Sequence, residues 1–317
     1  APIYKNDMLF KLSYEFGEGN YLEFKAGKTD LDGDVSYLGV TKADFKANPY
    51  QRYTGTRHDN MDSDQTRYYL RYLKEINDTT KLTAAIFSNE FNRDWYKISK
   101  VGNDVSGAEN IDYNGIGSGA LGVANNVAIL KGDLNGEIMY KHNDRTYETQ
   151  GIQANLEFEL SSHMLDLGFR YTNDDYTYNP GYTEDTYSMS TVTGLSLASS
   201  TGLKNTGNDT YMESDALEIY LLDEFSIGAL TLTPGIRYTS VDYFTHGGGT
   251  YGGTHTDTSL STTLLGIGAT YELGSNILFA GVHQGQALPG PKTKGLVNEE
   301  TSLGFEIGLR SNEASSF

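Results

Sequence analysis

Strand-like segments of alternating polarity recur along this chain of 317 residues, and they come in pairs joined by turns of about two or three residues. The turns fall at Gly17-Glu18-Gly19, Asn77-Asp78, Ser161-Ser162, Ile227-Gly228 and Gly274-Ser275. Long polar insertions follow the pairs, roughly over residues 30–64, 93–146, 178–210, 245–257 and 286–299. Short turns at one end of the strands and long loops at the other are typical of an outer-membrane β-barrel.

The alternation has a period of two residues, so each expected strand has one apolar face and one polar face. Between residues 152 and 160, one face carries Ile152, Ala154, Leu156, Phe158 and Leu160, and the other carries Gln153, Asn155, Glu157 and Glu159. A soluble β-sandwich would show the same alternation. The segments reach ten or more residues, and many of the 24 tyrosines lie near strand ends. Both features favour an all-β, antiparallel transmembrane β-barrel with long extracellular loops.

The composition narrows the possible functions. The sequence has no apolar run of about 18 residues, so we expect no transmembrane helix. A net charge of −18 argues against nucleic acid as a partner, and the absence of cysteine removes disulfides and thiolate sites. No Gly-x-Ser-x-Gly elbow or His-Glu-x-x-His motif occurs, so the sequence indicates that the protein is not an enzyme.

The number of strands predicts that the chain is part of a larger barrel. We count about 11 strand segments, whereas bacterial single-chain barrels have an even number. An open sheet would leave unpaired strand edges in lipid, which is not tolerated. The chain begins at Ala1 with no charged region, apolar core or cleavage site of a secretory signal. We therefore expect either a mature terminus or an internal cut there.

Four stretches of the chain, taken in order, resemble TonB-dependent outer-membrane receptors, and most closely their ferric-citrate (iron dicitrate) branch. These stretches are Tyr37–Phe45 with Asn48–Tyr53, Phe91–Lys97, Leu232–Tyr238, and Leu278–Gly285 with Pro289–Pro291, Glu299–Thr301 and Phe305–Arg310. The second reads Phe-Asn-Arg-Asp-Trp-Tyr-Lys and is similar to a motif at the outer end of a receptor strand. The matches spread over most of the chain and are specific as a set.

The resemblance implies a 22-stranded barrel around an N-terminal plug domain. Residues 1–317 would then be one middle portion of that barrel, with the plug, the first strands and the last strands absent. It also implies a monomer in the outer membrane of a Gram-negative bacterium, in contact with outer-membrane lipid and with the TonB complex through the plug. The expected function is uptake of an iron chelate, most closely ferric citrate, with no cofactor and with iron only as part of the chelate.

Other substrates and other barrels fit the same pattern. The ligand could be another siderophore, haem or cobalamin, because loops diverge faster than strands. A passive porin or an adhesin-like barrel is the alternative from a different class.

A ferric dicitrate is anionic, and its carboxylates suit planar guanidinium groups. Five loop cations are therefore the candidate ligand-binding residues: Arg52, Arg57, Arg93, Lys97 and Arg145. In the alternative interpretation these cations pair with loop aspartates and only order the loops. Four further arginines are expected to line the lumen: Arg67, Arg71, Arg170 and Arg237.

Three weaker features complete the sequence-based expectations. The stretch Asp30–Asp34 is similar to the start of a calcium loop, but turn chemistry explains it as well, because its twelfth position is Thr41. His246 and His255 flank a glycine-rich stretch, where a solvated loop tip is favoured over a haem, copper or zinc site. Residues 123–131 and 42–48 are expected to form short helices in lid loops.

Overall fold

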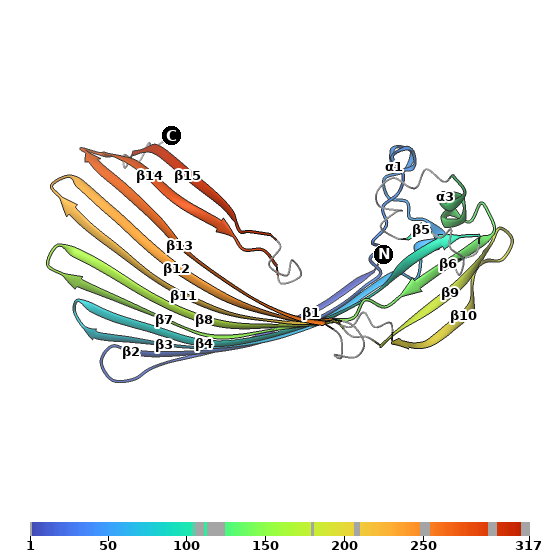
Figure 1. The fold of residues 1–317 in the computed structure, drawn as a ribbon, viewed down its shortest axis with the longest axis horizontal. Helices are drawn as coiled ribbons and strands as arrows, with labels where there is room; N and C mark the ends of the chain where they lie inside the picture. The colour runs from blue at the N-terminus through green and yellow to red at the C-terminus, as the bar shows by residue number, and fades with distance from the viewer. Residues whose placement is uncertain are drawn as a thin grey trace.

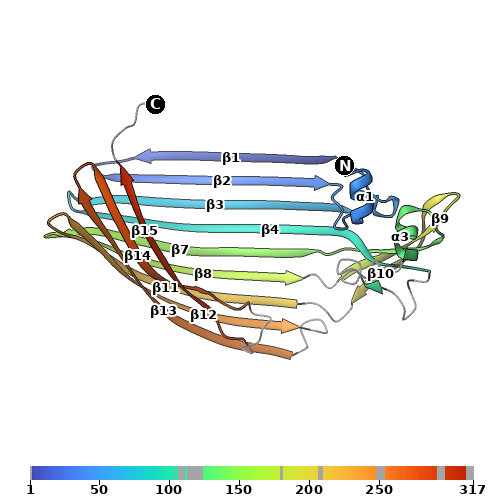
Figure 2. The ribbon, with the colours of Figure 1, turned by 90° about the horizontal axis from the view of Figure 1, so that it is seen from above.

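The computed structural model describes residues 2–103, 105, 111–112, 124–178, 181–205, 210–247, 254–290 and 297–311. Within them, eleven antiparallel strands follow one another across a curved wall (Figures 1 and 2). In sheet order they are β1 (Ile3–Glu15), β2 (Asn20–Gly33), β3 (Asn60–Asn77), β4 (Thr80–Gly102), β7 (Arg145–Leu160), β8 (His163–Tyr178), β11 (Thr210–Ile227), β12 (Leu230–Gly247), β13 (Thr254–Leu273), β14 (Asn276–Ala287) and β15 (Glu300–Ser311). The predicted all-β class and the number of wall strands are confirmed.

All five predicted tight turns join neighbouring strands of the wall, and Figure 1 shows them gathered at one end of it. Gly228 and Gly274 have φ of 64° and 63°, a left-handed conformation that glycine adopts without steric cost. Ser161 adopts φ of 59° in the turn between β7 and β8. Turns this short fix the register of each hairpin and therefore decide which face each side chain takes.

Two neighbouring rows of directly paired residues show how different the two faces of the wall are. One row across β3, β4, β7, β8 and β11 is apolar and consists of Leu70, Ile86, Ile152, Tyr171 and Leu217. The next row lies on the opposite face and consists of Arg71, Ala85, Gln153, Arg170 and Glu218. We call these the apolar face and the polar face. In a membrane barrel the apolar face meets lipid and the polar face lines the lumen.

Aromatic and imidazole rings lie against glycines of the neighbouring strand on the polar face. The directly paired residues are Phe87 with Gly151, Tyr220 with Gly168, Phe279 with Gly308, and His283 with Gly304. At Gly168 the approach is so close that a Cβ atom there would lie 1.9 Å from Cε1 of Tyr220. Such pairs compensate for glycine in a strand, because the ring covers the exposed backbone.

The outer ends of the strands carry a second, smaller structure, which we call the outer loop body (Figure 2). Its elements are α1 (Lys42–Ala47), the 3₁₀ helix η1 (Thr54–Thr56), β5 (Ile111–Asp112), α3 (Ala124–Lys131), β6 (Gly136–Lys141), β9 (Gly181–Ser190) and β10 (Gly194–Asn205). The end of β4 pairs with β5 and β6, β6 pairs with β9, and β9 pairs with β10. The two predicted short helices are confirmed as α1 and α3. No helix in the described ranges is long and apolar enough to cross a membrane.

The outer loop body has a hydrophobic core of its own, which the sequence did not predict. The core residues are Tyr53, Ile98, Val101, Ile129, Leu130, Ile138, Tyr140, Met189 and Leu195. They come from the outer end of β4 and from the insertions after β2, β4 and β8. The insertions are polar overall, as the sequence indicates, but their scattered apolar residues are buried together.

Candidate functional site

Three of the five predicted ligand-binding residues come together at the outer ends of β4 and β7. Arg93 of β4 lies directly opposite Arg145 of β7. Lys97 is four residues beyond Arg93 on the same strand, so the period of two places it on the same, polar face. We call Arg93, Lys97 and Arg145 the outer cation cluster. The strand-end pattern Arg-x-Trp-x-Lys places these side chains together with Trp95.

Aromatic rings line the β4 side of the outer cation cluster. The Lys97 ammonium lies 4.3 Å from the ring centroid of Tyr37 and 5.4 Å from that of Trp95. The Arg93 guanidinium lies 5.9 Å from the Trp95 ring, and Tyr37 and Trp95 meet edge to face with centroids 4.7 Å apart. The negative face of an aromatic ring attracts a cation without neutralising its charge. Both cations are therefore positioned and keep their positive charge.

On the β7 side of the cluster, the rings of two tyrosines contact Arg145. The Arg145 guanidinium lies 5.7 Å from the ring centroid of Tyr176 and 5.6 Å from that of Tyr178. Its Nε donates a hydrogen bond of 3.0 Å to Oδ1 of Asn143. The sequence interpretation missed the aromatic residues, although the shared parity of Arg93, Trp95 and Lys97 along β4 could have identified one of them.

The cluster holds an excess of positive charge. Lys97 is only 8% exposed, and it pairs in register with Lys141 of β6, within the outer loop body. Burial lowers the pKa of Lys97 from 10.5 to about 8, assisted by the neighbouring charges of Lys141, Arg145 and Arg93. Among the described residues, Arg93 and Arg145 form no ion pair, and the buried Nε of Arg93 has no hydrogen-bond partner. An anion placed here would relieve the repulsion and fill that donor.

The other two predicted residues, Arg52 and Arg57, bond to loop groups instead. Arg52 donates to the carbonyl of Asp34 at 2.8 Å, to that of Asp59 at 3.2 Å and to Oγ1 of Thr56 at 2.9 Å, and also to the Thr56 carbonyl. Those contacts fix the loop between β2 and β3.

Arg57 is exposed and donates to the Leu195 carbonyl at 3.0 Å, which ties η1 to β10. The hydrogen bonds of Arg52 and Arg57 therefore match the alternative interpretation, in which cations order the loops. The acceptors of Arg52 are backbone carbonyls and the Thr56 hydroxyl, and those of Arg57 are the Leu195 carbonyl and Nε2 of His58.

A buried carboxylate lies beneath Lys97. Asp59 is 0% exposed and accepts hydrogen bonds from Oγ of Ser36 at 2.7 Å and from the backbone N–H of Ile98 at 3.1 Å. Burial raises the pKa of Asp59 to about 6, and the charges of Arg52 and Lys97 oppose that rise. Asp59 therefore joins the insertion after β2 to the end of β4 and fixes the strand that carries Lys97.

The four predicted lumen arginines lie on the polar face, in the register rows already described or in rows of the same parity. Arg71 lies 3.6 Å from the buried carboxylate of Glu23, and Arg67 lies 3.4 Å from the exposed carboxylate of Asp7. Arg170 and Arg237 lie over the rings of Phe87 and Tyr220, respectively. Wall carboxylates thus contact two of these arginines and wall aromatic rings contact the other two.

The calcium-like stretch forms part of a strand and not a turn. Asp30 and Asp32 of β2 lie directly opposite Asp64 and Asp62 of β3, and Asp62 lies opposite Asp94. The turn interpretation of this stretch is therefore wrong, since β2 continues to Gly33. Throughout the described ranges, no three or more His, Cys, Asp or Glu side chains form a group that could hold a metal ion.

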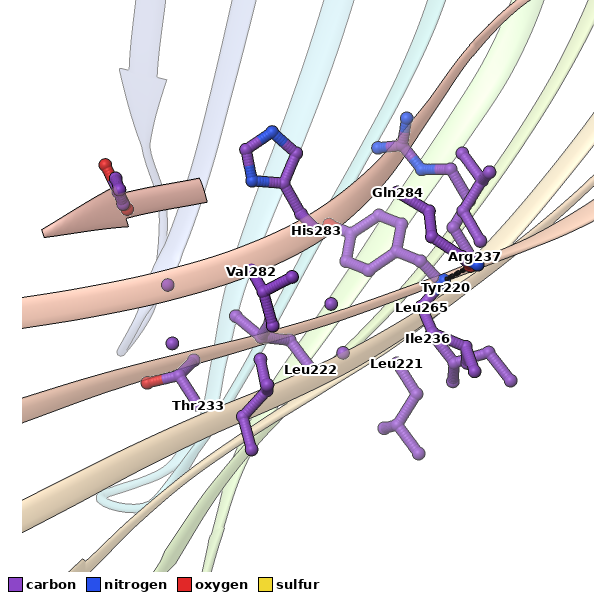
Figure 3. Close-up of a pocket in the computed structure, with 17 residues that line it drawn as sticks. Tyr220, Leu221, Leu222, Thr233, Ile236, Arg237, Leu265, Val282, His283 and Gln284 are labelled. Atoms are coloured by element: carbon purple, nitrogen blue, oxygen red, sulfur yellow. Dashed lines mark hydrogen bonds between the residues drawn. The ribbon is translucent and has the colours of Figure 1, made fainter. Parts of the chain in front are cut away.

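A hollow of about 460 Å³ on the wall is lined by residues of β11–β15 (Figure 3). Its lining includes Tyr220, Arg237, His283 and several glycines, and Figure 3 shows Gln284 beside Leu265. The backbone N–H of Leu265 donates to Oε1 of Gln284 at 2.9 Å. The lining is mainly apolar and carries a single arginine, so it suits an anionic chelate less well than the outer cation cluster does.

Comparison with known proteins supports this architecture. The family described as "TonB dependent receptor-like, beta-barrel" matches residues 10–317. The chain is similar to the ferric citrate transporter FecA, with 20% identity, a TM-score of 0.68, and coverage of 98% of this chain and 41% of that one. It is also similar to the ferric-catecholate import receptor Fiu of E. coli K12, with 16% identity, a TM-score of 0.63 and coverage of 99% and 49%.

A copper transporter, OprC, shares the fold with 14% identity, a TM-score of 0.62 and coverage of 98% of this chain and 43% of that one. At these identities the likeness shows the fold and not the ligand. The chain spans less than half the length of these three structures. No curated protein matches it.

Proposed function

Since the chain belongs to the TonB-dependent receptor β-barrel family, we propose that it forms the wall and the capture loops of a receptor for an anionic iron chelate, with ferric citrate as the first candidate. The family consists of transporters of the Gram-negative outer membrane and not of enzymes, and it works without a bound cofactor. The observation that carries the proposal is the outer cation cluster. It presents three cations on one face, at the end of the strands where the loops lie.

In this proposal Arg93, Lys97 and Arg145 contact the carboxylates of the chelate. Paired arginines suit carboxylates because each guanidinium can donate two parallel hydrogen bonds. Arg52 and Arg57 act indirectly by holding the loop between β2 and β3. The buried Nε of Arg93 supports a direct role for that residue, because a desolvated donor gains most from an arriving acceptor.

The aromatic residues support a second candidate ligand. Tyr37 and Trp95 present ring faces beside the cations, and an aromatic anionic chelate such as a ferric catecholate could stack there. Citrate lacks a ring and would use only the charges. The two ligands therefore differ in their expected dependence on Trp95.

We further propose that residues 1–317 are one portion of a monomeric 22-stranded barrel that also contains a plug domain, through which TonB would act. The ends of the described sheet support this proposal. β1 and β15 each pair with a neighbour on one side only, and nearly all their residues are exposed. Unpaired edges in hydrocarbon leave backbone groups without partners, so further strands are needed to close the wall.

Binding of iron chelates to the intact receptor in detergent tests the ligand proposal. We expect the double variant Arg93→Gln with Arg145→Gln to bind ferric citrate at least ~100-fold more weakly, since charged hydrogen bonds contribute about 1.5–3 kcal/mol each. Lys46→Gln removes an exposed cation of α1 and should change affinity little. Trp95→Phe should weaken only a ferric catecholate.

The outcomes separate the candidates. Unchanged affinity for both chelates in the double variant would refute the outer cation cluster as the ligand site. If the receptor binds ferric catecholate but not ferric citrate, and Trp95→Phe weakens that binding, the ligand is the second candidate. A receptor that binds neither chelate but conducts small solutes in a planar bilayer would favour the passive porin.

A further inference from the structure

Two histidines that flank the glycine-rich stretch 248–253 lie on neighbouring strands. His246 of β12 is directly opposite His255 of β13 in the antiparallel register. Their ring centroids lie 5.6 Å apart and the ring planes differ by only 21°. The expectation of a solvated loop tip without fixed geometry is wrong for this pair, because β12 and β13 continue to Gly247 and Thr254 and hold both imidazoles in the sheet.

From this geometry we infer that His246 and His255 together bind a divalent transition-metal ion, such as Cu(II) or Zn(II). Imidazole nitrogen is a preferred ligand of both ions. Directly opposite residues have Cβ atoms about 4.5–5.5 Å apart, and a metal–nitrogen bond is about 2.0–2.1 Å long. Small side-chain rotations therefore bring one nitrogen of each ring to a shared ion without movement of the backbone.

The surroundings of the pair suit a solvated metal site. His255 is exposed and His246 is half-buried, so water can fill the remaining coordination positions. The Phe244 ring lies 4.7 Å from the His246 ring and 6.4 Å from the His255 ring, which restricts the rotamers of both imidazoles. Phe244 thereby reduces the entropy that the two side chains would lose on binding the ion.

The pair lies outside the hydrocarbon layer although it belongs to the apolar face. His246 is eight residues beyond the exposed Tyr238 on β12, which is about 26 Å along a strand. The intervening residues of the same parity are Ser240, Asp242 and Phe244, of which the first two are polar. An ion at the pair therefore approaches from the aqueous exterior.

The metal site is also separate from the outer cation cluster. The register row that starts at Arg93 and Arg145 continues through Tyr178 and Thr210 to Gly247, the residue after His246. Neighbouring residues of a strand point to opposite faces, so the histidines lie on the other side of the wall from the cations. The inference is thus independent of the proposed chelate ligand.

Titration of the intact, untagged receptor with Cu(II) tests this inference, with the ion detected by electron paramagnetic resonance. We expect a site at which two imidazole nitrogens split the copper signal. His246→Asn or His255→Asn should each weaken binding at this site by about 100-fold or more, because linking two ligands raises avidity by about 10²–10⁴. His283→Asn, on the polar face, is the matched control and should leave the site intact.

The double variant His246→Asn with His255→Asn supplies the background from any other copper site. Equal copper affinity and an equal spectrum in wild type and double variant would overturn the inference, as would coupling to one nitrogen only. Binding should also weaken on acidification, since protons compete with the metal ion for imidazole nitrogen. A site whose affinity did not change between pH 7.5 and pH 5 would equally contradict it.

Discussion

Lys97 should lose its charge at an unusually low pH, and this loss can be observed without any ligand. With a pKa of about 8, the side chain is roughly 90% charged at pH 7 and roughly 10% charged at pH 9. A lysine at its ordinary pKa of 10.5 would stay charged over that range. The shift arises because Lys97 is buried and lies beside Arg93, Arg145 and Lys141.

Trp95 reports this change directly. Its ring lies 5.4 Å from the Lys97 ammonium, and it is the one tryptophan among the 317 residues. Loss of the ammonium charge removes a cation–π contact, so the emission of Trp95 should titrate with a midpoint near pH 8. Subtraction of the signal of Trp95→Phe isolates this residue within the intact receptor. The midpoint should disappear in Lys97→Met, and in Lys97→Arg it should lie beyond the measured range.

The lowered pKa of Lys97 also makes the stability of the folded protein depend on pH. The folded protein binds fewer protons than the unfolded chain between about pH 8 and pH 10.5, so the contribution of Lys97 to stability rises with pH in that window. The difference between the two pKa values corresponds to roughly 3 kcal/mol. Lys97→Met should therefore stabilise the outer loop body at pH 7. A wild-type emission that does not titrate between pH 7 and pH 9 would refute the reasoning.

Three further predictions follow from packing and charge. Ile138→Ala should destabilise the outer loop body by about 2–5 kcal/mol, seen as faster hydrogen exchange in β6 and α3 with unchanged exchange in the wall; equal exchange would contradict a shared core. Gly168→Ala should lower the melting temperature of the barrel, because its Cβ would collide with the Tyr220 ring, whereas Gly268→Ala meets nothing closer than 3.8 Å and should have little effect. The hydrogen bond from Lys131 lowers the pKa of Asp44 to about 2. The contribution of Asp44 to stability is therefore present above about pH 4 and is lost as the pH falls toward 2. Hydrogen exchange in α1 that does not change between pH 4 and pH 2 would contradict this prediction.

The wall could be predicted from the sequence because its information is local. The alternation along residues 152–160 sets the faces, and turns such as Asn77-Asp78 set the register, so neither requires knowledge of distant residues. The proximity of three of the five candidate cations could also be predicted, since Arg93 and Lys97 share a strand end and Arg145 begins the next wall strand.

The outer loop body could not be predicted in the same way, because its contacts join residues far apart in the chain. The run Gly136–Lys141 is short and only its three central residues are apolar, so by pattern it could be a helix segment or a strand. Its pairing with β4 on one side and with β9 on the other makes it a strand. The roles of Arg52 and Arg57 depend on carbonyls that only this fold places within reach.

The shared core of the outer loop body limits how the specificity of this receptor could be altered by exchanging loops. Residues 103–144 supply Ile129, Leu130 and Ile138 to a core that also contains Tyr53 and Met189 from two other insertions. A chimera that received only one foreign loop would leave the other two with uncovered apolar side chains. The smallest transferable unit is therefore all three insertions together, and ligand specificity in this protein should be inherited as a block.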